Sequence, residues 1–339
     1  GARPLQVIAF GVLPQVITAW IGGVQLASQQ AAQLTEDSSL AVLSLVDSIA
    51  TAATAMSGGD VPSTLSVSTV QGLLKAVNSV AAYHTKTALR RRLSAHRRGL
   101  AAADVTTDGE ASQITTSVLN NFGSLVALGM LPGQTAQDFT QKELRMSVQV
   151  LSPDAAANST AVVPLTLLEK YLGVQSSTVS VPVRAGSSEA AVSLVVTSVR
   201  SELLDYLDAD IQSNPVTLYA SVGLCLDPPC YVDIVLQNSQ AVDFDRLNTP
   251  EVYVFNITCA RADYTLHDVF CPDGSPMQMQ CNGTAGVLHQ QCPVTTYSAA
   301  CNALSGASGE LLSGASSGCV VQSFSDTDVI CRCDTTHVF

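Results

Sequence analysis

The stretch GCVVQSFSDTDVICRCDTTHVF (residues 318–339) is the most specific part of this sequence. It holds three of the chain's 10 cysteines, and all 10 lie between Cys225 and Cys333. An even number of cysteines gathered in one third of a chain is typical of local disulfides formed in an oxidising compartment. A zinc site would need cysteine pairs at metal spacing with histidine partners, whereas Cys331-Arg332-Cys333 is too tight and the five histidines do not cluster. We therefore expect disulfides and no metal.

Three N-glycosylation sequons indicate the same compartment. Asn158, Asn256 and Asn282 are each followed by a second residue and then by Ser or Thr. Two of the three lie inside the cysteine-rich region, so the two signals agree. We predict that these asparagines carry glycans and that the chain passes through the secretory pathway.

Composition excludes some classes of protein. With 339 residues, 47% of them hydrophobic, the chain can bury a substantial core in two domains or in one large domain. The net charge of −12 argues against nucleic acid, because phosphate binding needs clustered positive charge. No signal in the sequence calls for a cofactor.

The uncharged segment Leu5–Ala27 is long enough to span a bilayer. Three glutamines, Pro14 in the middle and the pair Gly22-Gly23 favour a buried helical segment instead, and membrane association is left open. A signal peptide is not expected, because no initiating Met with a basic region precedes the segment. No other stretch is apolar enough to cross a membrane.

The first 130 residues have helical periodicity. Leu, Val and Ile recur at helical spacing over 39–49, over 70–81 and over 114–128. Gly58-Gly59 and Gly129 follow two of these runs, as expected at helix ends. We predict amphipathic helices joined by polar links, which form a small helical subdomain over residues 1–130.

From about residue 140 the hydrophobic pattern changes to period two. Proline, glycine and Asn/Asp groups separate the alternating runs, which indicates an antiparallel β-sandwich over residues 131–339. Helices first and strands second define an α+β chain. The expected strands are Met146–Val150, Thr178–Val183, Ala191–Val196, Thr217–Val222, Tyr231–Leu236 and Tyr253–Ile257.

Basic residues are concentrated in the segment Thr85–Gly99, which holds six of the chain's 16 Lys and Arg residues. The simplest interpretation is a solvated helix end with its loop. The alternatives are a dibasic processing site or a surface that docks an acidic partner. The candidate residues are Arg90, Arg91, Arg92, Arg97 and Arg98.

The C-terminal stretch resembles the GPS motif, which ends the GAIN domain of adhesion receptors and polycystin-like membrane proteins. Cys319, Cys331, Cys333 and Phe339 fall in register with that motif, and Cys301 takes the place of its first cysteine, so that the motif covers residues 301–339. The tryptophan that usually follows the first cysteine is absent. A helical subdomain leading into a β-sandwich also looks like a GAIN domain.

The resemblance implies the disulfides Cys301–Cys331 and Cys319–Cys333. Each closed loop would contribute on the order of 3 kcal/mol in the chain-entropy account. Cys225 and Cys230 flank a turn-forming Leu-Asp-Pro-Pro insert and are expected to pair with each other. Two more bridges would join four further cysteines, with a connectivity that the sequence leaves open: Cys259, Cys271, Cys281 and Cys292.

Members of the family can cleave themselves within a His-Leu-Thr sequence. That chemistry needs a hydroxyl nucleophile directly after the scissile bond and a general-base histidine two residues before that nucleophile. Here Thr335 occupies the base position and His337 the nucleophile position, while Thr336 precedes the scissile bond. An imidazole cannot perform the N-to-O acyl shift, so we predict that this chain does not cleave itself.

The sequence therefore predicts a non-catalytic extracellular module of a larger membrane-anchored or surface-filament protein. Expected partners are other protein chains at the cell surface, with a membrane channel or filament subunits as candidates, and a membrane reached through a helix outside this chain. The resemblance extends to proteins of the ciliary or flagellar membrane. Two alternatives stay open: an autoproteolytic receptor fragment, and a secreted hydrolase.

The hydrolase alternative has two weak signals. Gly314-Ala315-Ser316-Ser317-Gly318 matches the GxSxG string of esterases, but it lies in a Gly/Ser/Ala-rich loop rather than between a core strand and a helix. His267 near Asp263 and Asp268 could form a base with its orienting acid, yet no nucleophile is placed beside them. We expect a linker in the first case and surface polar residues in the second.

Overall fold

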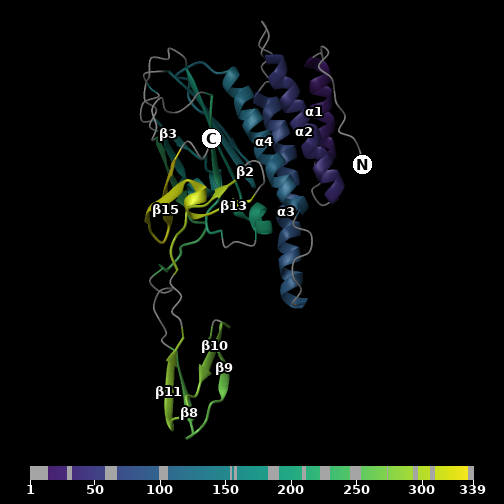
Figure 1. Cartoon of the computed structure of the whole chain (residues 1–339). Helices are drawn as coiled ribbons and strands as arrows, with labels where there is room; N and C mark the ends of the chain where they lie inside the picture. The colour runs from purple at the N-terminus through teal and green to yellow at the C-terminus, as the bar shows by residue number, and fades with distance from the viewer. Residues whose placement is uncertain are drawn as a thin grey trace. The chain divides into compact units, whose positions relative to one another are not determined.

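The structure is a computed structural model that describes residues 14–28, 33–57, 67–98, 106–152, 155, 159–181, 191–207, 211–221, 230–244, 253–272, 274–292, 297–305 and 310–334. Four long helices come first, and antiparallel strands follow, so the predicted α+β class is confirmed (Figure 1). The helices are α1 (Pro14–Ser28), α2 (Glu36–Ser57), α3 (Val67–Arg98) and α4 (Thr106–Leu128).

The helices form where the sequence places apolar residues at helical spacing. Thr35 and Ser38 exchange hydrogen bonds at the start of α2, and Glu36 and Asp37 put negative charge in its first turn, where the helix dipole favours it. The buried stripes of the bundle are the predicted ones, and their most buried members are Leu43, Val46, Ile49, Leu73, Leu74, Val77, Leu119 and Phe122.

The apolar N-terminal segment enters this bundle through α1. Ile21 and Val24 are buried in the same core as α2 and α3, as a bundle helix requires. Residues 5–13 of the expected segment Leu5–Ala27 lie outside the described residues. Among the residues that the structure describes, none of the helices is long and apolar enough to cross a membrane.

Two antiparallel sheets form a sandwich beside the helices. The first has the order β1-β2-β5-β6 and the second the order β14-β15-β7-β4-β3. Their strands are β1 (Gln137–Thr140), β2 (Leu144–Leu151), β3 (Ser159–Val162), β4 (Thr178–Val181), β5 (Val192–Val199), β6 (Val216–Ala220), β7 (Tyr231–Gln237), β14 (Cys319–Phe324) and β15 (Asp328–Asp334). A one-and-a-half-turn helix, α5 (Leu167–Tyr171), joins β3 to β4.

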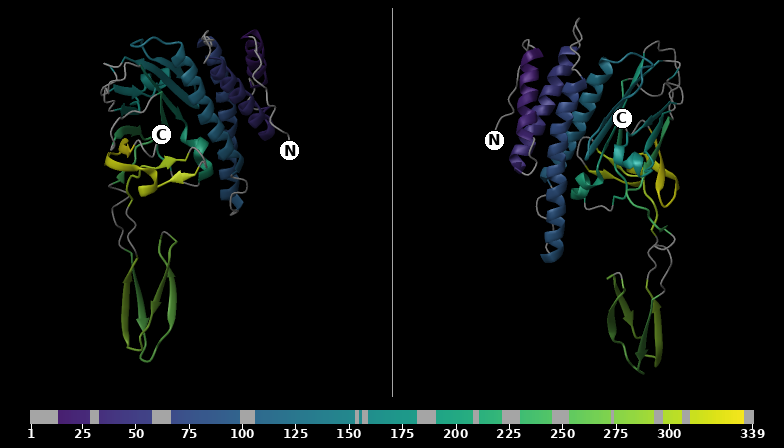
Figure 2. Two further views of the ribbon diagram at one scale, coloured as in Figure 1. Left: turned by 45° about the horizontal axis from the view of Figure 1, so that its top comes forward. Right: turned by 180° about the vertical axis from the view of Figure 1, so that it is seen from behind.

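The first sheet is buried on both of its faces. Val195 of β5 belongs to the core shared with the helices, whereas its neighbours Leu194 and Val196 belong to the core between the two sheets. Alternate residues of one strand point to opposite faces, so β5 lies between two layers. The helices cover one face of this sheet, as both views of Figure 2 show, and the second sheet covers the other.

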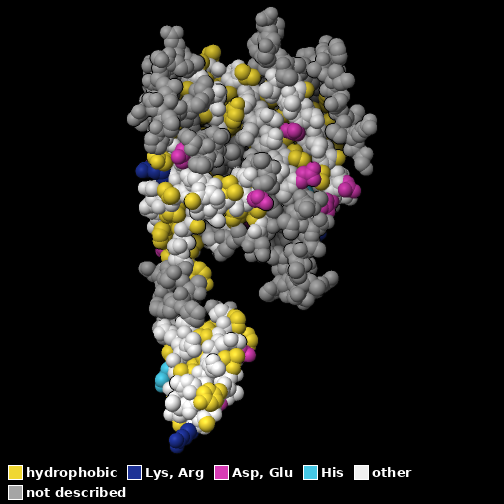
Figure 3. All heavy atoms as spheres, viewed as in Figure 1, with side chains coloured by type: hydrophobic (Ala, Val, Ile, Leu, Met, Phe, Trp, Pro, Cys, Tyr) yellow, Lys and Arg dark blue, Asp and Glu magenta, His cyan; other side chains and the backbone are white. Residues whose placement is uncertain are grey.

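Residues Ala241–Ala299 form a compact unit of their own, separate from the unit made by Gly1–Gln240 and Ala300–Phe339. It contains two hairpin-like pairs, β8 (Val254–Cys259) with β11 (Gly286–Gln291) and β9 (Leu266–Phe270) with β10 (Pro276–Gln280). Apolar side chains remain on its surface, among them Tyr264 and Phe270 at 68% and 66% exposure (Figure 3).

This second unit differs from the expectation of one sandwich over residues 131–339. The strand expected at Tyr253–Ile257 exists as β8, but it pairs with β11 rather than with a strand of either large sheet. An alternating pattern specifies a strand and its buried face, whereas its pairing partner depends on the whole chain. The remaining elements after the insertion are the short pair β12 (Ala303–Leu304) and β13 (Leu311–Leu312) and a 3-10 turn, η3 (Gly314–Ser317).

A disulfide-bonded C-terminal hairpin as the candidate functional site

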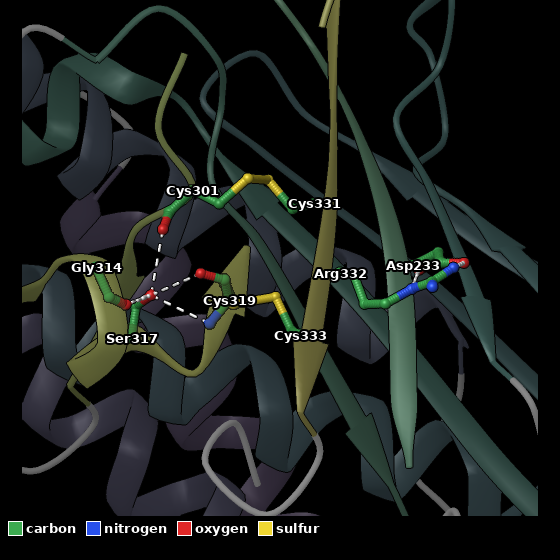
Figure 4. Close-up of a disulfide and its surroundings, with 8 residues drawn as sticks. All are labelled: Asp233, Cys301, Gly314, Ser317, Cys319, Cys331, Arg332 and Cys333. Carbon is green, nitrogen blue, oxygen red and sulfur yellow. Dashed lines mark hydrogen bonds and ion pairs between the residues drawn. A yellow bond between two sulfur atoms is a disulfide. The ribbon is translucent and has the colours of Figure 1, made fainter. Parts of the chain in front are cut away.

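The candidate site is built on the hairpin β14–β15, and β15 lies between β14 and β7 in the second sheet. Cys319 and Cys333 are directly opposite each other in the hairpin, with their Cα atoms 4.0 Å apart, and they form a disulfide. Cys331 is bonded to Cys301 with a Cα separation of 5.8 Å (Figure 4). This is the connectivity that the resemblance to the GPS motif implies.

Both disulfides are buried because alternate side chains of β15 point to the buried face of the sheet. Val329, Cys331 and Cys333 point to the buried face, while Ile330 and Arg332 point to the other. All four cysteines are at most 7% exposed. β15 is therefore held by covalent bonds at two positions in addition to its hydrogen bonds with β14 and β7.

Ser317 forms hydrogen bonds with backbone groups around the turn that precedes this hairpin. Its hydroxyl lies within hydrogen-bond distance of the carbonyl oxygens of Gly314 (2.7 Å) and Cys301 (3.2 Å), and it accepts the backbone N–H of Cys319 at 3.1 Å (Figure 4). The side chain is fully buried, at 1% exposure. The segment expected to be a linker is thus an ordered turn, which ends at Gly318 with the left-handed φ of 65° that glycine tolerates.

The esterase-like string does not form a nucleophile elbow. Its central serine, Ser316, is exposed and donates to the carbonyl of Ser313. The string folds as a 3-10 turn that leads into β14, an edge strand, rather than as a turn from a core strand into a helix. The described histidines with resolved side chains lie elsewhere: His84 in α3, and His267 and His289 in the second unit.

Arg332 and Asp233 form the charged pair of the site. They are directly opposite each other on β15 and β7, and Arg332 donates from Nε (2.7 Å) and from a terminal nitrogen (2.9 Å) to the two carboxylate oxygens. The hydrogen bonds from Arg332 lower the pKa of the Asp233 carboxyl, against a smaller opposing effect of burial. Both side chains are about half exposed, so the pair clamps the two strands at the surface.

The three residues at the cleavage position are not placed by the structure. β15 ends at Asp334, and Thr335, Thr336 and His337 lie outside the described residues. Cys230 is disulfide-bonded, but its expected partner Cys225 also lies outside them.

The second unit supplies the connectivity that the sequence left open. Cys259 is bonded to Cys281, and Cys271 to Cys292. These bridges join the two hairpin-like pairs of a small unit that has little apolar core, which is the usual role of disulfides in small extracellular modules.

Two of the three predicted glycosylation sites are visible and accessible. Asn256 is exposed on β8, next to His289 of β11. Asn282 is exposed in a turn, where its side-chain oxygen accepts the backbone N–H of Thr284, the last residue of its sequon. Asn158 lies outside the described residues.

The basic segment forms the C-terminal part of α3, as the simplest interpretation expected. Arg90 is exposed, whereas the side chains of Arg91, Arg92, Arg97 and Arg98 are outside the described part of the structure.

The structure brings Cys281 close to Asp263 and His267, the two residues that the sequence suggested as an acid and a base, and sequence reasoning missed this third member. One potential ligand atom of each lies within 4.8 Å of the others. The sulfur of Cys281 is already bonded to Cys259, so no thiolate is available there to a metal. The grouping depends on the pairing of β9 with β10, and no local sequence pattern predicts that pairing.

Comparisons with known proteins bear on the fold alone. No protein-family model matches the sequence, and no curated protein matches it either. Among solved structures, the full extracellular region of zebrafish Gpr126/Adgrg6 is similar, with a TM-score of 0.50 and 12% sequence identity. The match covers 96% of this chain and 34% of that chain, so this chain spans about a third of its length.

Proposed function

We propose that this chain is a GAIN-like extracellular module with a degenerate GPS motif and no catalytic activity. The observation that carries the proposal is the double covalent attachment of β15, through Cys301–Cys331 and Cys319–Cys333. The structural similarity to the extracellular region of an adhesion receptor supports it, as does the order of helices followed by a sandwich. The cysteines would then serve folding rather than cleavage.

The buried disulfides support an extracellular location, because such bonds form and persist in oxidising compartments. The module would belong to a larger membrane-anchored or surface-filament protein, with its membrane helix outside this chain. Its partners would be other protein chains at the cell surface, including a channel or filament subunits, and a ciliary membrane is one setting for it.

Absence of self-cleavage follows from chemistry at three positions. Thr335 has no basic group to accept a proton, and the imidazole of His337 cannot form the ester intermediate. The chain purified from a secretory host should therefore give one intact mass after enzymatic removal of N-glycans, denaturation and reduction. A species shortened at Thr336 would contradict the proposal.

A gain-of-function variant makes this test two-sided. Thr335→His together with His337→Thr restores a base and a hydroxyl nucleophile at the motif positions. If the fold is that of a GAIN domain, this double variant should yield some cleaved product, whereas His337→Ala should stay intact. Cleavage of the wild-type chain would favour the autoproteolytic alternative.

The hydrolase alternative is tested with two neighbouring serines. Ser317→Ala should destabilise the first unit by about 1–3 kcal/mol, because it leaves the buried N–H of Cys319 without its acceptor. Ser316→Ala, at the exposed centre of the GxSxG string, should change stability by less than about 0.5 kcal/mol. Urea unfolding measures both, and an ester-hydrolysis rate that Ser316→Ala abolishes would overturn the non-catalytic proposal.

A further inference from the structure

The pair formed by β9 and β10 has one covered face and one exposed face. The covered row of side chains includes Met279 and, just after β10, Cys281, at 0% and 1% exposure. The other row, which we call the outer face, carries Tyr264, Leu266 and Phe270 at 68%, 50% and 66% exposure. Apolar residues exposed singly are common on protein surfaces, whereas several in one row mark a surface that another group can cover.

The outer face continues past the two strands to a predicted glycosylation site. Two backbone hydrogen bonds extend the ladder in the register of β9 with β10: the N–H of Cys281 donates to the carbonyl of Thr265 at 3.1 Å, and the N–H of Gly283 donates to that of Asp263 at 2.7 Å. The same register places Asn282 directly opposite Tyr264.

Asn282 and Tyr264 are therefore neighbours across the ladder. They form a pair without hydrogen bonds of its own, since the hydrogen-bonded positions are on either side of it. In such a pair the two side chains share one face, with Cβ atoms about 4.5–5.5 Å apart. A glycan on Asn282 thus begins beside the ring of Tyr264.

The ring of Tyr264 lies against the backbone of the sequon itself. Gly283, the middle residue of the sequon, has a φ of 84°, and a Cβ atom built on it would be 2.6 Å from both Cζ and the hydroxyl oxygen of Tyr264. Glycine tolerates this φ and leaves the space to the ring. The ring is held next to the attachment site, while most of the residue stays exposed.

The side chain of Asn282 can carry a glycan without losing any of its described contacts. Its Oδ1 atom accepts the backbone N–H of Thr284 at 3.1 Å and also the hydroxyl hydrogen of that residue. A glycan is attached to the other end of the carboxamide, Nδ2, which makes no hydrogen bond to any residue that the structure describes.

We propose that the first N-acetylglucosamine of a glycan on Asn282 packs on the ring of Tyr264 and covers the outer face as far as Leu266. One face of a pyranose ring presents C–H groups, whose slight positive charge suits the negative face of an aromatic ring. Leu266 is two residues, or about 7 Å, from Tyr264 along the chain. The inference rests on the secretory location proposed above, because sequons are glycosylated in that pathway.

Asn256 provides a comparison within the same unit. It lies on β8 opposite His289 of β11, whose Nδ1 atom is 2.5 Å from the Oδ1 atom of Asn256. Its exposed apolar neighbours on that face, Val254 and Val287, are aliphatic. Among the paired residues of β8 and β11, a glycan on Asn256 therefore meets no phenyl or phenol ring on its own face.

The test is NMR on the full chain from a secretory host fed with isotope-labelled glucosamine, after an endoglycosidase has trimmed each glycan to a single N-acetylglucosamine. Asn282→Gln identifies the signals of the sugar at position 282 by their loss. In the wild-type chain these signals should be shifted upfield by the ring current, relative to those of the sugar on Asn256. Tyr264→Leu should remove the shift and Tyr264→Phe should keep it, while the Asn256 sugar changes in neither variant.

Amide hydrogen exchange, followed by mass spectrometry, measures what the contact contributes to the stability of the pair. Tyr264→Leu should speed exchange in β9 and β10 about two- to tenfold when Asn282 is glycosylated, the factor expected for an aromatic contact. In a Thr284→Ala chain, which lacks this glycan, the same replacement should change the exchange rate by less than about twofold.

Sugar signals at position 282 that are unshifted, or a shift that survives Tyr264→Leu, would overturn the inference. So would a shift that grows with protein concentration, since a second copy would then cover the face. A bare Asn282 beside a glycosylated Asn256 would overturn the inference alone and leave the extracellular proposal standing. Native protein without a glycan at any of the three sequons would contradict both.

Discussion

Arg332 and Asp233 illustrate how one pair of side chains can fix the register of two strands. A guanidinium and a carboxylate that meet through two parallel hydrogen bonds require both strands to be aligned to within one residue. A slip by one residue would also move Cys331 and Cys333 from the buried face to the exposed one. The pair therefore fixes the register of β15 against β7, and the Cys319–Cys333 bond fixes its register against β14.

Replacement of Asp233 by Asn should lower the free energy of unfolding at pH 7 by less than about 1 kcal/mol, because the pair is half exposed and screened. The pKa of Asp233 is depressed in the folded state by the hydrogen bonds from Arg332. Its contribution is thus present above the unfolded pKa of about 3.9 and is lost as pH falls through the lower folded value.

Urea unfolding of the wild-type chain and of Asp233→Asn at several pH values measures this difference. The stability gap should be constant above about pH 5 and should close at lower pH. Asp326→Asn, in the turn between β14 and β15, is the matched control and should show no such closing gap. A gap that widens on acidification would mean that the ion pair is not the cause.

At the scale of elements, the packing of α4 on the first sheet depends on a glycine. A Cβ atom built on Gly123 would lie 2.2 Å from one methyl group of Val195 and 2.8 Å from the other. The side chain of Val195 is fully buried between the helices and the sheet, so it has little room to move. The close approach of α4 to β5 thus requires the absence of a side chain at position 123.

Gly123→Ala should therefore destabilise the first unit by about 1–3 kcal/mol, although alanine favours a helix over glycine by about 1 kcal/mol. Gly72→Ala in α3 is the matched control. There the new methyl group would meet only the end of the flexible Gln25 side chain, so the variant should be neutral or slightly stabilising. Thermal unfolding distinguishes the two, and equal effects would refute the packing argument.

Elements with a strong internal period could be predicted from the sequence. The run at 39–49 lies in α2, and five of the six expected strands belong to the two large sheets. α5 was not predicted, because a five-residue helix with an exposed apolar face has no periodic signal. The two bridges of the second unit were expected, but their connectivity was not, since any pairing of four cysteines satisfies the spacing.

At the scale of the whole molecule, the second unit is an insertion between neighbouring points of the first. Asn238 donates its N–H to the carbonyl of Thr327 at 2.8 Å, just before the unit begins. The chain returns at Cys301, which is bonded to Cys331. Thr327 and Cys331 are four residues apart along one strand segment, or about 13 Å. A short linker can therefore replace the insertion.

Deletion of residues 241–299, with a linker of about six residues in their place, should leave the first unit folded. Disulfide mapping by mass spectrometry should still find Cys301–Cys331 and Cys319–Cys333. The excised unit, expressed alone in an oxidising host, should form Cys259–Cys281 and Cys271–Cys292. Scrambled bridges or an insoluble first unit would show that the two units depend on each other for folding.

The position of Cys333 has a mechanical consequence. A β-strand that is pulled from one end detaches from its neighbouring strands by losing their shared hydrogen bonds one after another. A force applied to the chain on the C-terminal side of Asp334 first breaks the pairing of Asp334 with Tyr231. The force then acts on the Cys333–Cys319 bond, which transmits it to β14. The Cys331–Cys301 bond transmits the remaining force to the chain segment at Cys301. β15 can be stripped from the sandwich only after a reductant, or a force that ruptures covalent bonds, has released both.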